Sequence, residues 1–314
     1  MSQLEDRPTP LRGVFAAVVT PFTDKLDPNL DSFVAHCRWL LANGCNGLVP
    51  LATAGEANSM SATQRLRLIE ALAIAGLPME RMIIGGGSCA LDDAVTLTRA
   101  IMTVRAGGVL LLPPFYYRDT GEDGLYRFYA ETIERVGNPD LRVFLHHRPQ
   151  MSGAPITFDL ITRLRTTFGP IIAGVQNGSG DWEVTAALLR EFPELAIFSG
   201  TERFLLDTLR AGGAGCISAT VNLTAPLAGP VYAQWLSDKA DALQAALTAV
   251  RVLFDAFPTP AAQKEVLTRL TGDPSWRNLL PPLLPMAPAM RTELARQLET
   301  LPQIRTVLAA ARAA

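Results

Sequence analysis

The sequence is poor in the side chains that most often act as nucleophiles. Lysine occurs only as Lys25, Lys239 and Lys264 among 314 residues, and arginine carries nearly all of the positive charge. Chemistry that depends on a primary amine therefore has few candidates. We expect Lys239 and Lys264 to lie in a helical tail and Lys25 in a solvated loop, so none of the three is predicted to enter an active site.

Cysteine is also sparse, and its spacing carries no metal signature. The four cysteines, Cys37, Cys45, Cys89 and Cys216, do not form the closely spaced pairs of zinc sites. We expect reduced and mostly buried thiols, as in a cytoplasmic protein. No metal site and no cofactor is predicted.

The sequence has neither a strong excess of one charge nor a long apolar run. The formal net charge is -2, the pI is about 6.0, and no basic block occurs, so nucleic acid and anionic membranes are not expected as partners. No run approaches the roughly 18 apolar residues of a membrane span. The opening residues MSQLEDRPTPLRG lack the apolar core of a signal peptide. A cytoplasmic globular protein is predicted.

Eight short apolar runs alternate with segments of helical length along most of the chain. Near-continuous apolar strands such as VFAAVV and GVLLLP are typical of a parallel sheet that is buried on both faces. The predicted strands are 14–20, 47–53, 81–87, 108–113, 142–147, 171–176, 196–200 and 215–220.

The segments between these strands carry helix start and stop signals. Segments 30–44, 61–76, 91–108 and 203–213 are amphipathic, and each ends on a glycine, which is the common residue just after a helix. Ser61 is the predicted cap of the second of them.

Eight strand–helix units predict an α/β fold of the (β/α)8 TIM-barrel class over residues 1–224, preceded by a short N-terminal segment. An open doubly wound sheet is the alternative, which periodicity alone does not exclude. Residues 225–314 are predicted to form a helical C-terminal extension packed on the barrel. Its expected helices are 227–257, 260–271 and 287–313.

The predicted strand ends indicate what the barrel mouth binds, because barrel active sites form there. These ends are rich in hydroxyls, glycines and aromatic rings, and their only carboxylates are Glu56 and Glu202. Such a rim suits a small polar or anionic organic ligand. Glu56 is expected to anchor its loop rather than to bind the ligand.

The order of several motifs resembles one known family. GVFAAVVTPF, LATAGE, IIGGGS, PPFYYR, GSGD and AGGAGCISATVN follow one another between Gly13 and Asn222, and PTPAAQK follows at 258–264. Together they resemble the dihydrodipicolinate synthase/N-acetylneuraminate lyase family. The resemblance implies a (β/α)8 barrel with a helical tail, a homo-oligomer (dimer or tetramer), and chemistry at a carbon–carbon bond beside a 2-oxo acid.

The family's imine-forming lysine is missing from this chain. The family pattern at the end of strand six is roughly G-I-K-x-x-S/T-G, and the chain has GVQNGSG, which places Gln176 at the lysine position. A carboxamide nitrogen is not nucleophilic and cannot form an imine. The Gln176 side chain can donate and accept hydrogen bonds, which would suit an oxo group or a hydroxyl of a ligand.

Other family positions differ as well. In the strand-five pattern Y-N-x-P-x-R-T-G, His146 takes the tyrosine position and Met151 the arginine position. At strand two, Thr53 matches the first of two hydroxyls and Ala54 replaces the second. Tyr116 matches the tyrosine that, in the family, reaches into a neighbouring subunit's site.

These comparisons give the predicted site. His146, Tyr116 and Thr53 are assigned to catalysis. Substrate binding is assigned to Gln176, Ala54, Gly55 and Ile217. Because adjacent strand residues face opposite ways, only one of His146 and His147 can face the barrel interior. The family register favours His146, and a pKa near neutrality would suit it as general acid or base. The alternative for His146 is a histidine that packs in the core without a catalytic role. The alternative for Gln176 is a side chain that fills the barrel mouth without binding a ligand.

The predicted function is a lyase of this family that acts on a small 2-oxo or hydroxy acid by imine-free chemistry. Hydration, dehydration or proton transfer is favoured over aldol cleavage, because stabilising an enolate demands several well-placed donors. The alternative is a non-catalytic metabolite-binding or regulatory homologue. A two-domain nucleotide-binding protein is a third, weaker option.

Overall fold

The chain forms a barrel of eight parallel strands. The computed structural model describes residues 11–304, and the strand order is β2-β1-β8-β7-β6-β5-β4-β3. A parallel bridge between Leu48 and Met82 joins the two end strands, so the predicted TIM barrel is confirmed over the open sheet. The strands are β1 Gly13–Ala17, β2 Gly47–Val49, β3 Ile83–Gly85, β4 Gly108–Leu111, β5 Val143–His147, β6 Ile172–Asn177, β7 Ala196–Ser199 and β8 Gly215–Ser218.

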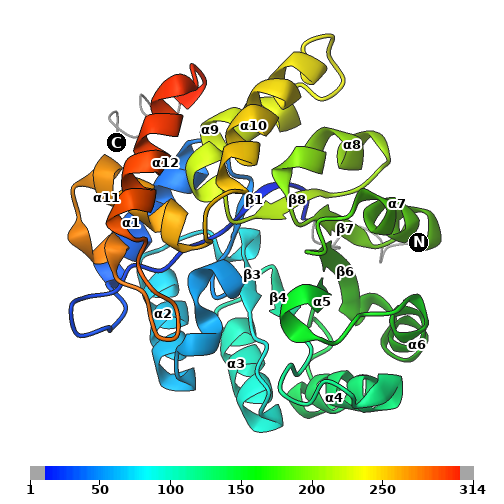
Figure 1. The fold of residues 1–314 in the computed structure, drawn as a ribbon. Coiled ribbons are helices and arrows are strands. Elements are labelled where there is room, and N and C mark those ends of the chain that lie inside the picture. Colours follow the sequence, from blue (N-terminus) through cyan, green and yellow to red (C-terminus); the bar gives the residue numbers. More distant parts are fainter. Residues whose placement is uncertain (1–10, 305–314) are drawn as a thin grey trace.

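Helices surround the strands, and three more helices gather on one side of the barrel (Figure 1). The helices that follow the strands are α1 Leu30–Ala42, α2 Ala62–Ile74, α3 Leu91–Thr103, α4 Gly121–Val136, α5 Pro149–Ser152, α6 Phe158–Phe168, α7 Trp182–Glu191, α8 Leu205–Arg210 and α9 Val221–Ala233. The C-terminal helices are α10 Ala240–Phe254, α11 Ala261–Thr271 and α12 Pro288–Thr300. Ser61 caps α2 in a capping box with Gln64, as predicted.

The helix boundaries differ from the predictions in three places. Helix α3 ends at Thr103 because Arg105 adopts a left-handed conformation (φ 57°), and the glycines that follow lead into β4. The single helix predicted over 227–257 is wrong, since α9 and α10 are separate helices. The predicted division after residue 224 lies inside α9. The helix predicted over 287–313 ends at Thr300, where Leu301 adopts an extended conformation, and the part of the prediction from 305 onward lies outside the described residues.

Two hydrophobic clusters give the barrel its layers. One lies between strands and helices and includes outward side chains such as Val175 and Leu145. The other combines the barrel interior, where the rings of Phe144 and Phe15 pack against Phe198, with apolar side chains of the C-terminal extension. A Cβ on Gly108 would lie 2.4 Å from the Phe144 ring, so this strand position must stay small for the interior to close.

The C-terminal extension is joined to the barrel by a buried ion pair. Lys264 of α11 places its Nζ 2.6 Å from Glu56 Oε1, and neither side chain is exposed. The ammonium also donates to the Asn278 carbonyl and lies over the Phe22 ring, while the Leu280 N–H donates to Glu56 Oε2. Burial lowers the pKa of Lys264 to about 8 and raises the pKa of Glu56, and their mutual attraction opposes both shifts. Glu56 therefore anchors its loop, as expected.

Two further sequence expectations concern membranes and thiols. Among residues 11–304, no helix combines the length and the apolar character needed to cross a membrane. All four cysteines are free, and three of them are buried, as predicted.

Removal of the Lys264 charge tests the anchor. Lys264→Met leaves the Glu56 carboxylate buried without its cation, so the free energy of unfolding should fall by about 3–5 kcal/mol. Urea-induced unfolding measures this. The control is Arg210→Met, which removes an exposed ion pair with Asp241 and should leave stability nearly unchanged. An equally small effect of Lys264→Met would show that the pair does not hold the extension.

Candidate functional site

A cavity of about 310 Å³ opens at the carboxyl ends of the strands, a volume at the lower end of the range for small-molecule sites. Leu110 and Ile217 give it apolar walls, above the packed phenylalanines of the barrel interior. Its polar lining comes from strand ends and from the extension: Thr53, His146, Arg148, Gln176, Thr201, Arg203, Ser218, Thr220, Arg251, Asp255 and Thr259.

Gln176 faces this cavity from β6 and is buried. Its Nε2 donates to the Ile217 carbonyl at 3.4 Å. Its Oε1 is buried and accepts no hydrogen bond from any described residue. Exchanging the amide nitrogen and oxygen would put two acceptors against each other, so the contact with Ile217 fixes the orientation. The amide therefore offers a free acceptor to a ligand.

His146 lies beside Gln176, because the two residues are partners in the pairing of β5 with β6. His146 lines the cavity, whereas His147 faces outward and its Nδ1 accepts the Ile156 N–H at 3.1 Å. Burial, then the charges of Arg148 and His147, lowers the pKa of His146 to about 3. His146 therefore lacks the near-neutral pKa that would suit a general acid or base, and its imidazole is uncharged at neutral pH.

The predicted strand-two residues divide into two groups. Thr53 and Ala54 line the cavity, and the Thr53 hydroxyl has no partner within the described part of the chain. Gly55 does not line it. Its N–H donates to the Ala52 carbonyl at 3.0 Å, and its own carbonyl accepts the Thr20 hydroxyl. The binding role predicted for Gly55 is thus not supported, because its backbone groups already pair within the protein.

Tyr116 lies apart from the cavity in a single chain. Its side chain is 76% exposed, and its ring packs edge-on against Tyr117 at 5.2 Å between centroids. A catalytic role for Tyr116 would require a second subunit, so this assignment stays a prediction. Ile217 lines the cavity as predicted, and its carbonyl holds the Gln176 amide.

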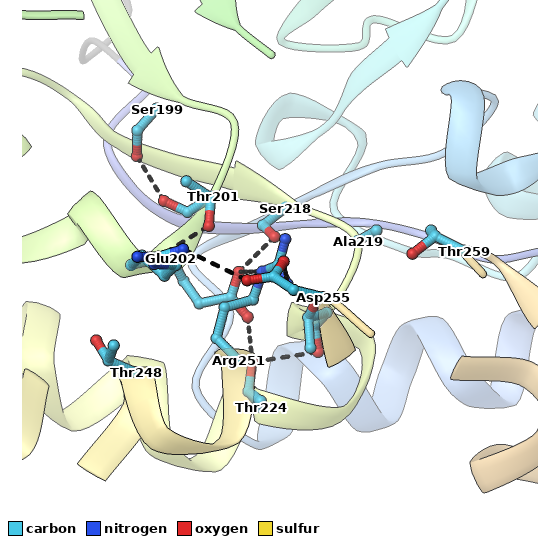
Figure 2. Close-up of polar contacts among 12 residues, drawn as sticks. Ser199, Thr201, Glu202, Ser218, Ala219, Thr224, Thr248, Arg251, Asp255 and Thr259 are labelled. Atoms are coloured by element: carbon cyan, nitrogen blue, oxygen red, sulfur yellow. Dashed lines mark hydrogen bonds and ion pairs between the residues drawn. The ribbon is translucent and has the colours of Figure 1, made fainter. Parts of the chain in front are cut away.

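A buried carboxylate that sequence reasoning only noted in passing makes polar contacts with its neighbours, including Ser218 (Figure 2). Glu202 follows β7 and is fully buried. Its Oε2 accepts the Ser218 hydroxyl, and its Oε1 accepts the Thr224 hydroxyl at 2.9 Å. Ser218 itself lines the cavity. A hydroxyl that lines the cavity is therefore hydrogen-bonded to a buried carboxylate outside the lining.

Three arginines, which sequence reasoning missed, also line the cavity. Arg148 follows β5, Arg203 follows β7, and Arg251 comes from α10 together with Asp255. The alternation along β5 could have identified Arg148, which is two residues after the inward His146. Arg251 and Asp255 gave no such signal, because tertiary packing of the extension brings them to the site.

Within residues 11–304, neither an amine nor a metal-binding cluster is found at the cavity. None of the three lysines lines the cavity, and Lys264 is bound to Glu56 instead. In the same part of the chain, no group of three or more His, Cys, Asp or Glu side chains has a metal-binding arrangement.

Comparison with known proteins identifies relatives over nearly the whole chain. The model of the dihydrodipicolinate synthetase family matches residues 10–301. An uncharacterized DapA-like lyase of Chloroflexus aurantiacus is 35% identical over 88% of this chain and 92% of its own length. The 4-hydroxy-tetrahydrodipicolinate synthase of Acidiphilium cryptum is 30% identical over 90% of this chain and 95% of its own length. The crystal structure of dihydrodipicolinate synthase from Agrobacterium tumefaciens superposes with a TM-score of 0.84 at 28% identity, covering 92% of this chain and 99% of that one.

The buried histidines predict how stability depends on pH. The folded pKa of His146 is about 3 and that of buried His36 about 4, both below the unfolded value near 6.5. The contribution of these two histidines to the free energy of unfolding is therefore fully present above about pH 6.5. It is lost as the pH falls from there toward the folded pKa values, because only the unfolded chain takes up the protons.

The measurement is urea-induced unfolding of the wild type and His146→Gln at about pH 7.5 and about pH 5. From about pH 7.5 to about pH 5, the free energy of unfolding of the variant should fall by about 2 kcal/mol less than that of the wild type. His36→Gln, at the other buried histidine, should behave similarly. An unchanged pH dependence in His146→Gln would show that this imidazole is not held neutral.

Proposed function

Since the chain belongs to the dihydrodipicolinate synthetase family, we propose that it is a lyase that acts on a small hydroxy or oxo acid without forming an imine. One observation carries the proposal. At the end of β6, a buried carboxamide with a free Oε1 faces the cavity, and no lysine of residues 11–304 lines that cavity.

The orientation of Gln176 favours a ligand that donates a hydrogen bond. A buried acceptor without a partner is costly, and a ligand hydroxyl would satisfy it. A keto oxygen would not, because it is itself an acceptor. The free acceptor therefore favours a hydroxy acid as the substrate, with the Thr53 hydroxyl available as a second contact. Neutral His146, beside Gln176, can donate or accept a hydrogen bond, but its low pKa makes it a weak base.

Ser218 and Glu202 are the stronger candidates for proton transfer. A proton removed from ligand carbon can pass to Ser218 Oγ while the Ser218 proton passes to Glu202 Oε2, along the existing hydrogen bond. For a 2,3-dihydroxy acid, the proton leaves C2, the C3–O bond breaks, and return of the proton to the departing hydroxyl forms water. The resulting enol rearranges to a 2-oxo acid, and the pair ends in its starting state.

The Tyr116 and Tyr117 rings are exposed by 76% and 71%, which supports the proposal that the chain forms a homo-oligomer. We expect a dimer or tetramer in light scattering, and a strictly monomeric mass at micromolar concentration would contradict it. A cytoplasmic location and a small acid as the partner stay predictions from the sequence.

Borohydride trapping tests the imine-free proposal. Reduction in the presence of pyruvate should leave the intact mass of the wild type unchanged, because a carboxamide cannot form an iminium. In the matched variant Gln176→Lys, an amine enters the same cavity, and a reduced pyruvate adduct is expected. A stable adduct on the wild-type protein would contradict the proposal.

The proton path is tested by Ser218→Ala. We expect kcat for dehydration of small 2,3-dihydroxy acids, followed as 2-oxo acid formation, to fall about 100-fold or more. Ser199→Ala is the control, because Ser199 is equally buried but donates to the Thr201 carbonyl. Full activity in Ser218→Ala would exclude the path. Thermal stabilisation by these acids without turnover would favour the metabolite-binding homologue instead.

A further inference from the structure

Arg148 is a mostly buried cation without a counter-ion. It lines the cavity just after β5, and its guanidinium makes no ion pair or hydrogen bond with any residue between 11 and 304. Burial, and then the charge of Arg251, lowers the pKa of Arg148. A cation in such a place is costly unless something compensates it.

The other two cavity arginines already use the nearby carboxylates. Asp255 pairs with Arg251 at 2.5 Å and with Arg203 at 3.4 Å. Arg251 Nε lies 3.6 Å from Glu202 Oε2, and Glu202 also holds two hydroxyls (Figure 2). Two carboxylates thus balance two of the three arginines, and Arg148 supplies the excess positive charge.

An excess of guanidinium groups on one side of a small cavity is suited to an anion. Guanidinium binds carboxylate and phosphate oxygens through paired N–H donors, and this binding is strengthened where water is excluded. The position is also new relative to the family pattern, because the strand-five arginine position is occupied by Met151, which is 55% exposed and does not line the cavity.

We propose that the carboxylate beside the ligand hydroxyl lies at Thr53, and that Arg148, with Arg203 and Arg251, binds a second anionic group of the substrate, so that the natural ligand is a dianionic hydroxy acid. This inference rests on the proposed function, in which Gln176 accepts a hydrogen bond from the ligand hydroxyl. The second group is a carboxylate or a phosphate, since both satisfy a guanidinium cluster.

The test compares acids that differ only in this group. Binding of 2-hydroxyglutarate and 2-hydroxypentanoate, which share a five-carbon chain, is measured by calorimetry at fixed ionic strength. Wild-type protein should bind 2-hydroxyglutarate at least about tenfold more tightly. The pair 3-phosphoglycerate and glycerate makes the same comparison for a phosphate, and the larger ratio identifies which anion the site prefers.

Variants assign the preference to the arginines. Arg148→Met should bring the two members of the preferred pair to within about threefold, while Arg148→Lys keeps part of the difference. Arg203→Met, at a more exposed position, provides a second test in case Arg148→Met does not fold. The control is Arg190→Met, at an exposed arginine on α7, which should keep the wild-type ratio.

The outcomes separate this inference from the proposed function. Equal affinity of the wild type for both members of each pair overturns the second anion site and leaves the proposed function intact. An unchanged ratio in both Arg148→Met and Arg203→Met also overturns it. Failure of all four acids to bind overturns the proposed function, and this inference with it.

Discussion

The inward and outward alternation of side chains in a closed parallel barrel is the constraint on which the site depends. In β5 and β6 it sends Leu145 and Val175 to the helices, and it sends His146 and Gln176 to the interior as neighbours. A shift of one residue would reverse both assignments. The bulk of Phe144 at the next inward position helps to fix the register, because the strands beside it carry glycines that admit its ring.

The C-terminal extension completes the site as well as covering the barrel. The Lys264–Glu56 pair holds α11 against the strand-two loop, and α10 places Arg251 and Asp255 on the cavity wall. The charge pattern of the cavity therefore depends on residues about one hundred positions away from Arg148 in the sequence. Loss of the extension would remove part of the binding surface, in addition to destabilising the barrel.

Much of this arrangement could be predicted from the sequence, for identifiable reasons. Apolar runs of strand length and the order of the motifs were sufficient for all eight strands and for the inward position of Gln176. The pKa of His146 was not predictable, since it depends on how completely the interior closes around the ring. Arg251 and Asp255 were missed because only tertiary packing brings them to the strand ends. The pairing of the Gly55 backbone was not predictable either, because its hydrogen-bond partner, Thr20, lies at a different strand end.

A crystal structure of the protein with a bound 2-hydroxy acid would show whether the free Oε1 of Gln176 receives the ligand. The ligand hydroxyl should lie within hydrogen-bond distance of Gln176 Oε1, with Nε2 still donating to Ile217 and no covalent bond between ligand and protein. A ligand bound elsewhere in the cavity, or continuous density from the ligand to an amine, would contradict it.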